Sequence, residues 1–141
     1  MADPRLAVEY GGIGGKYVTF KIDNSTIVYA ATSNGGSASV GLAVGMSAAD
    51  TVQLVSDAEE VVGKLISVES DNTCTVQVRG GMELPGGTGA SLTLGKKIVG
   101  DLLVSAKGYV REVNTAVPAE LGVARGMILD AGTTTAVWVY L

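Results

Sequence analysis

The sequence contains no histidine and only one cysteine, Cys74, in 141 residues. The absence of histidine removes the commonest general base and metal ligand in proteins, together with every Ser-His or Cys-His nucleophile. A single cysteine can form no internal disulfide and cannot supply the cysteine cluster of a zinc site. These absences exclude most hydrolase classes and disulfide-stapled scaffolds, and they are typical of a chain made in a reducing cytosol.

Charged and aromatic residues are also scarce, at 17% and 5% of the chain, whereas 47% is hydrophobic. The formal net charge of −4 repels phosphate backbones, so nucleic acid is not an expected partner. The longest unbroken apolar run is residues 136–141, and residues 1–5 have no basic and apolar leader pattern, so neither a membrane span nor a signal peptide is expected. A surface with so few charges favours burial in an oligomer or against a partner.

Two glycine-rich stretches, residues 11–16 and 85–90, have the composition of phosphate-binding loops. A P-loop needs glycine five residues before its Gly-Lys pair and Ser or Thr after it, but Tyr10 and Tyr17 occupy those positions. A dinucleotide fingerprint in the second stretch needs a glycine where Leu92 stands, and no helix pattern follows. We interpret both stretches as loops.

The acidic cluster Asp57, Glu59 and Glu60 lacks the alternating ligands and the glycine of an EF-hand loop, and we interpret it as a solvated turn. The sequence therefore assigns no residue a catalytic, cofactor-binding or metal-binding role. We expect no enzyme activity, no cofactor and no small-molecule substrate.

Twenty glycines, twenty valines and twelve threonines give an all-β composition, because valine and threonine favour strands and glycine favours turns. Many short strands at regular spacing indicate a small barrel or sandwich. A hairpin turn is predicted at Asp71-Asn72, and a short helix over 117–121, with Pro118 near its start and Gly122 as its stop. Ten strands are predicted: 17–23, 26–31, 40–44, 52–55, 61–70, 73–82, 96–99, 109–113, 124–129 and 135–141.

Cys74 lies in a stretch of period-two alternation over residues 73–79. Cys74, Val76 and Val78 share one face, and polar side chains take the other. This pattern predicts a half-buried strand in which the cysteine is a small, inert core residue rather than a nucleophile.

The N-terminal segment, residues 1–16, is predicted to be an extended arm on a glycine-rich hinge, followed by one β domain over 17–141. Leu6, Val8 and Tyr10 alternate with less apolar residues, and the flexible run 11–15 separates them from the first strand. Such an arm suits the addition of a strand to a neighbour's sheet edge. The alternative is that the segment forms an edge strand of its own barrel.

Residues 40–141 resemble the small capsid decoration, or cement, proteins of tailed bacteriophages. The resemblance begins with the stretch VGKLISVESDNTCTVQVRGGMELP, residues 62–85, a strand that ends in Arg-Gly followed by an acidic-apolar-Pro step. It continues through the glycine-led stretches GKKIV at 95–99 and GYVREV at 108–113, then ARGMIL at 124–129 and a short last strand. No comparable resemblance covers the first forty residues.

This resemblance implies a β-tulip-like protein, commonly a homotrimer, that sits on the outside of an icosahedral head in the virion and clamps neighbouring major capsid subunits. Exposed trimer and capsid contacts are expected to use aromatic and arginine side chains, which dominate interface hot spots. In residues 135–141, Val137, Val139 and Leu141 share one strand face and the aromatic residues the other. The alternative is that both faces are buried in one closed sandwich. With the arm, the candidate contact residues are Leu6, Val8, Tyr10, Tyr109, Arg125, Trp138 and Tyr140.

Three other functions remain open. One is a trimeric all-β enzyme of the dUTPase kind, whose carboxylate, Ser and Gly motifs around a nucleotide and Mg²⁺ are not found. Another is an adhesive or ligand-binding β module, for which exposed aromatics are scarce. The last is a structural component of a phage tail or baseplate.

Overall fold

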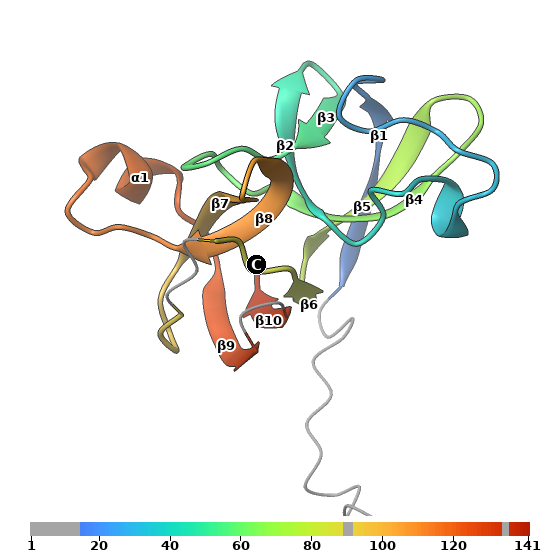
Figure 1. Ribbon diagram of the computed structural model, residues 1–141. Coiled ribbons are helices and arrows are strands. Elements are labelled where there is room, and N and C mark those ends of the chain that lie inside the picture. Colours follow the sequence, from blue (N-terminus) through green and yellow to red (C-terminus); the bar gives the residue numbers. More distant parts are fainter. Residues whose placement is uncertain (1–14, 89–91, 134–135) are drawn as a thin grey trace, which may run out of the picture.

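The computed structural model describes residues 15–88, 92–133 and 136–141 and confirms the all-β class (Figure 1). One short helix and one 3-10 turn interrupt the strands of the described chain. The elements are β1 (Lys16–Ile22), η1 (Asn34–Gly36), β2 (Ala43–Ala48), β3 (Thr51–Leu54), β4 (Gly63–Val68), β5 (Thr73–Arg79), β6 (Gly81–Leu84), β7 (Ile98–Leu103), β8 (Ala106–Glu112), α1 (Pro118–Val123), β9 (Met127–Thr133) and β10 (Ala136–Tyr140).

The first five strands close a small barrel in the order β1-β3-β2-β4-β5, seen at the upper right of Figure 1. β1 pairs with β3 in parallel and with β5 antiparallel, and this double pairing closes the ring. Val44, Val52, Leu65 and Val76 are fully buried inside it. Cys74 belongs to the same core and is 1% exposed, as its strand pattern predicted.

Two smaller sheets extend the barrel: one has the order β6-β10-β9, and β7 pairs with β8 in the other. A second core fills the space between them, with Met82, Ile98, Ile128 and Val139 among its members. The C-terminal residue Leu141 also lies in this core.

The predicted strand 73–82 divides into β5 and β6 at Gly80, which has a φ of 100°. Glycine adopts this backbone region without the Cβ clash of other residues. Gln77, placed on the polar face by the alternation, is buried because its amide donates to the carbonyl oxygens of Arg79 (3.2 Å) and Gly81 (3.1 Å) at the bend. The bend therefore lets one run of sequence serve both the barrel and the second sheet.

The predicted strand 26–31 is wrong, because this segment forms irregular loop structure. The carboxylate of Asp23 accepts hydrogen bonds from the backbone N–H groups of Thr26 and Ile27 (both 3.0 Å), which curls the chain around it. Thr26 Oγ1 then accepts the N–H of Leu54 (2.9 Å) and ties the loop to β3. These local side-chain bonds replace the ladder that a strand would need.

The other predictions differ from the structure in their bounds, most of all the predicted strands 40–44, 96–99 and 124–129, which share only two or three residues with β2, β7 and β9. The hairpin at Asp71-Asn72 is present between β4 and β5, but four residues, 69–72, connect the strands rather than two. Helix α1 runs through Gly122 to Val123 instead of stopping before it. Lys16 belongs to β1 rather than to the hinge, and residues 100–108, which had no assignment, complete β7 and begin β8. The predicted arm contacts Leu6, Val8 and Tyr10 lie outside the described residues.

Candidate interaction surfaces

The outer face of the β6-β10-β9 sheet carries the C-terminal aromatic residues. Val137 and Val139 of β10 point into the second core and are fully buried, so Trp138 and Tyr140 point away from it. Trp138 is half-buried and pairs in register with Glu83 on β6. Tyr140 is 42% exposed and lies opposite Met127 of β9, which is 45% exposed.

This arrangement corresponds to a sheet with one face on the core and the other turned outward, rather than to a strand buried on both faces. Aromatic and methionine side chains are enriched where proteins contact one another. The outward side chains of Trp138, Tyr140 and Met127 therefore form a candidate contact surface, which we call the C-terminal face.

Two other candidate contact residues, Tyr109 and Arg125, are not members of this face. Tyr109 is half-buried on β8, opposite Asp101 of β7. Arg125 uses its guanidinium inside the chain, because Nη1 donates to the carbonyl oxygens of Val61 (3.0 Å) and Val62 (3.3 Å). Their roles in partner contact stay predictions.

Helix α1 is the one described element whose polarity is inverted. Glu120 is its buried residue, whereas Leu121 is 47% exposed and Val117, at the cap, is also exposed. An ordinary surface helix buries its aliphatic stripe and leaves its carboxylates in water. Helix α1 thus turns aliphatic side chains outward and a charge inward.

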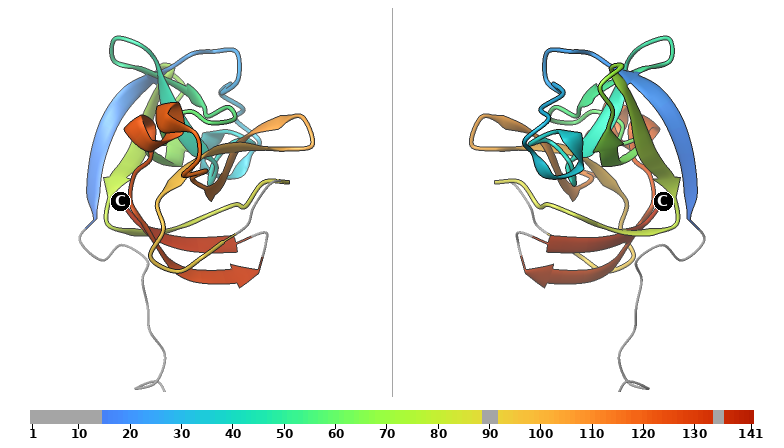
Figure 2. Two further views of the ribbon diagram at one scale, coloured as in Figure 1. Left: turned by 90° about the vertical axis from the view of Figure 1, so that its left-hand side faces the viewer. Right: turned by 90° about the vertical axis from the view of Figure 1, so that its right-hand side faces the viewer.

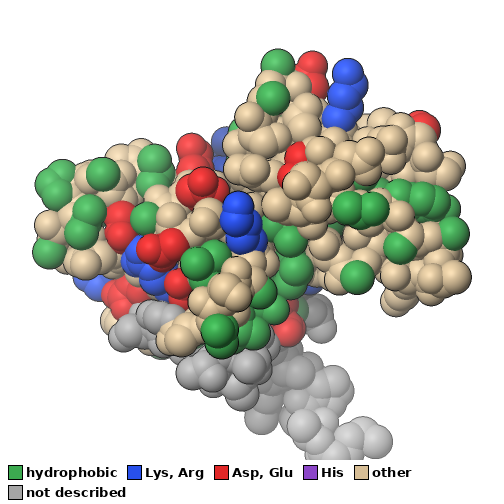
Figure 3. All heavy atoms as spheres, turned by 45° about the horizontal axis from the view of Figure 1, so that its top comes forward, with side chains coloured by type: hydrophobic (Ala, Val, Ile, Leu, Met, Phe, Trp, Pro, Cys, Tyr) green, Lys and Arg blue, Asp and Glu red, His purple; other side chains and the backbone are tan. Residues whose placement is uncertain are grey.

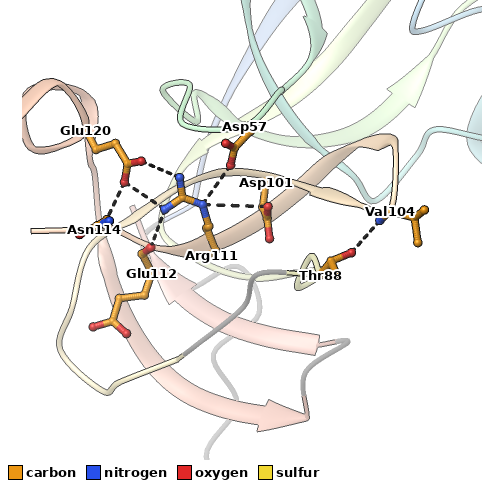
Figure 4. Close-up of polar contacts among 8 residues, drawn as sticks. All are labelled: Asp57, Thr88, Asp101, Val104, Arg111, Glu112, Asn114 and Glu120. Carbon is orange, nitrogen blue, oxygen red and sulfur yellow. Dashed lines mark hydrogen bonds and ion pairs between the residues drawn. The ribbon is translucent and has the colours of Figure 1, made fainter. Parts of the chain in front are cut away.

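A partly buried arginine on β8, Arg111, explains this orientation (Figure 4). Arg111 Nη1 donates to Glu120 Oε2 (3.0 Å) and Nη2 donates to Oε1 (2.7 Å), which makes a bidentate pair. The backbone N–H of Asn114 also donates to Glu120 Oε2 (2.9 Å), and Arg111 Nη1 donates to the Glu112 carbonyl oxygen (3.2 Å). Fork-to-fork bonding of this kind fixes direction as well as distance, so the helix is held in one orientation.

The same guanidinium joins two further parts of the chain. Arg111 Nε donates to Asp57 Oδ1 (3.0 Å) in the connection between β3 and β4, and it lies 4.0 Å from Asp101 Oδ1 on β7. In Figure 4 the carboxyl groups of Asp57, Asp101 and Glu120 all point toward Arg111. The cluster therefore connects α1, the β7–β8 sheet and the edge of the barrel.

The electrostatics of the cluster follow from these bonds. Hydrogen bonds from Arg111 and from the Asn114 N–H hold the pKa of Glu120 below its usual value. Hydrogen bonding to Glu120, with a further contribution from Asp57, raises the pKa of Arg111 above its ordinary value despite partial burial. Both groups are charged at neutral pH, and the arrangement is suited to holding surfaces in place.

The β7–β8 hairpin projects beyond the neighbouring elements, as the orange strands of Figure 2 show. At its tip Leu103 is 42% exposed and Val104 is 86% exposed, the highest value among the large hydrophobic residues described. Val104 also has a φ of 61°, a left-handed conformation that is a marked outlier for a β-branched residue. Two hydrogen bonds hold the hairpin against the segment before it: the Val104 N–H donates to Thr88 Oγ1 (2.6 Å), and the Thr88 N–H donates to the Leu102 carbonyl (2.8 Å).

A hollow of about 350 Å³ lies between β2, the β3–β4 connection and the end of α1. Its lining combines aliphatic side chains with two exposed acidic residues. The lining residues are Gly45, Met46, Ala58, Glu59, Glu60, Val62 and Val123.

Over residues 15–88, 92–133 and 136–141, no group of three acidic or cysteine side chains is placed to hold a metal ion. Within the same described ranges, no helix has the length and apolar character needed to cross a membrane.

Sequence reasoning missed both the inverted helix and the hairpin tip. The tip lacks the Gly, Asn or Asp residues that mark a tight turn, and its sequence, Val104-Ser105, gives no such signal. The helix is too short for its periodicity to show which side is buried, and Arg111 is nine positions from Glu120.

No family model matches the chain, and neither the curated proteins nor the solved structures provided a match.

Proposed function

We propose that this protein is a structural component of a phage virion that binds the outside of an assembled head and clamps neighbouring major capsid subunits. In this proposal it acts as a homotrimer, has no enzymatic activity, is made in the cytoplasm of a bacterial host and ends up on the capsid exterior. The sequence resemblance over residues 40–141 motivates the proposal, and the all-β class of the chain agrees with it.

The C-terminal face is the observation that carries the proposal. Tyr140 and Met127 lie opposite each other on adjacent strands and leave almost half of each side chain exposed, beside the half-buried Trp138. Large side chains fixed on a sheet lose little conformational freedom when they bind, so they give more affinity than the same residues on a loop. An outward sheet face with these residues suits a protein surface rather than a small molecule, which requires a concave site.

A reconstitution experiment tests the proposal. The purified full chain is added to phage heads assembled without it, and bound protein is measured by sedimentation and located by cryo-electron microscopy. We expect saturable binding to the head exterior and a higher temperature of head rupture. Binding to tails instead of heads, or no binding to either, would overturn the proposal.

Substitutions assign the contact to the C-terminal face. Tyr140→Glu with Met127→Glu places two charges on the face and is expected to weaken head binding at least about tenfold, because an unpaired charge is desolvated at the contact. Thr32→Glu is the matched control, since Thr32 is exposed in a loop of the barrel. Equal head binding by both folded variants would exclude the C-terminal face as the contact.

A further inference from the structure

The tip of the β7–β8 hairpin combines exposure with strain. Val104 presents most of its side chain to solvent from a left-handed backbone conformation, in which the Cβ of an L-residue crowds the following carbonyl oxygen. A strained residue held firmly by its surroundings points to a role outside the fold itself. The surroundings here do hold it, through the Thr88 hydroxyl and the Leu103–Ala106 pair that closes the hairpin.

The base of the hairpin is rigid as well. Asp101 on β7 and Arg111 on β8 belong to the charged cluster that also holds α1. Gly87 lies so close to Asp101 that a Cβ at this position would overlap the carboxyl group, so the segment before Thr88 is packed against the hairpin. The tip is therefore pre-organised, and little ordering cost would oppose its binding.

The hollow has the size and polarity to receive such a tip. A cavity of about 150 Å³ holds a benzene ring, so about 350 Å³ has room for two aliphatic side chains. Met46, Val62 and Val123 give the hollow apolar walls, and Met46 is itself exposed. Helix α1, which contributes Val123, also turns Leu121 outward, and Figure 3 shows hydrophobic side chains gathered over this helix at the left of the molecule.

The charges of the two surfaces are complementary. Exposed Lys107 follows the tip on β8, and the exposed carboxylates Glu59 and Glu60 stand at the hollow, with Arg125 Nε 3.9 Å from Glu60. Two carboxylates against one guanidinium leave the hollow with a net negative charge. A lysine beside an inserted tip would meet that charge, which favours the correct register of the two surfaces.

We infer that the hollow is the binding site for the β7–β8 hairpin tip of a second copy of this chain. Leu103 and Val104 of one protomer enter between Met46, Val62 and Val123 of the next, and Lys107 faces Glu59. The contact joins two different surfaces, so it is heterologous, and it forms a ring when the rotation from one copy to the next closes. The inference concerns contacts between copies and does not depend on what the assembled ring binds.

Engineered disulfides test which surfaces meet. Val104→Cys and Val62→Cys are made separately in the full chain, where native Cys74 is buried and serves as an unreactive background thiol. When the two proteins are mixed and oxidised with copper phenanthroline, one thiol from each is oxidised to an intermolecular disulfide. We expect the mixture to give a covalent dimer of one of each, in at least about tenfold higher yield than either protein alone. Equal yield from Val104→Cys alone would overturn the inference, because it would show tip against tip.

Charge reversal provides a second, independent measurement by sedimentation equilibrium. Lys107→Glu and Glu59→Lys are each expected to raise the dissociation constant between copies about tenfold, and the double variant is expected to restore it. Val28→Asp is the control, since Val28 is half exposed in a loop and belongs to neither surface. A wild-type chain that remains monomeric at high micromolar concentration, or a double variant no better than the singles, would overturn the inference. Neither result would bear on head binding through the C-terminal face.

Discussion

Arg111 and Glu120 form a bidentate ion pair, with Nη1–Oε2 and Nη2–Oε1 distances of 3.0 and 2.7 Å, on the inner side of α1. The side chains are 14% and 9% exposed, so the bonds are largely shielded from water. Since the helix buries this carboxylate while Leu121 stays exposed, the ion pair takes the place of the aliphatic contacts that normally seat a helix.

Glu120→Ala is expected to lower the free energy of unfolding by about 1–3 kcal/mol, because it leaves the guanidinium of Arg111 and the N–H of Asn114 without this acceptor. Glu112→Ala is the control, since its carboxylate bonds only to exposed Thr93 among the described contacts, and its effect should stay within about 0.5 kcal/mol. Urea unfolding at neutral pH measures both. Equal effects would show that the ion pair adds nothing beyond a surface contact.

The pH dependence of stability should also depend on Glu120. Its folded-state pKa is lowered by the hydrogen bonds from Arg111 and Asn114, whereas a glutamate in the unfolded chain has a pKa of about 4.3. A lowered folded pKa contributes stability that is complete above the unfolded pKa and is lost as pH falls through the folded pKa.

The difference in unfolding free energy between wild type and Glu120→Gln should therefore be constant from about pH 7 to pH 5 and shrink below about pH 4. The pKa of Asp23 is lowered too, because hydrogen bonds from Thr26, Ile27 and Ser25 outweigh the effect of its partial burial. Asp23 is present in both proteins, so its contribution to the unfolding free energy cancels in the difference. A difference that stays constant down to pH 3 would contradict the prediction.

Val104→Gly should separate stability from association. Glycine adopts a φ of 61° without the Cβ penalty, so we expect the unfolding free energy to rise by up to about 1 kcal/mol while binding between copies weakens. Val28→Gly, at an exposed valine without a positive φ, should not stabilise the protein. Urea unfolding and sedimentation measure the two effects. A destabilised Val104→Gly variant would show that the tip conformation is not strained.

Cys74→Val should leave folding and assembly intact. The thiol lies in the barrel core and burial raises its pKa, so it behaves as a small apolar group that valine replaces with similar volume. The change in unfolding free energy should be less than about 1.5 kcal/mol. Head binding is measured on the same sample, and its loss in a folded variant would contradict a packing role.

Deletion of residues 1–12 tests the predicted arm. The described chain begins at residue 15, and β1 begins at Lys16, which pairs with Arg79, so the deletion removes no described strand. We expect the barrel to fold and head decoration to weaken, because the arm's apolar side chains bury area on binding. Circular dichroism and head sedimentation measure the two effects. Unfolding would make the segment an integral strand, and unchanged binding would make it dispensable.

Local pattern in the sequence was enough to predict most strands and, for two of them, which side chains share a face. The alternation around Cys74 and from Val137 to Leu141 determines which side chains share a face, because successive residues of a strand point to opposite sides. Pro118 marked the start of the helix, because its fixed φ suits a first helical turn. The aromatic face of the last strand could thus be predicted before the fold was known.

Tertiary structure decided what local pattern does not contain. Asp57, Asp101, Arg111 and Glu120 meet only because β8, α1 and the β3–β4 connection pack together, and nothing in their spacing indicates it. The turn at Val104 has no turn residue and exists because β7, β8 and Thr88 impose it. A strand's alternation is set by neighbours along the chain, whereas a buried charge and a strained turn are stabilised by groups that are distant in sequence, so only the folded chain determines them.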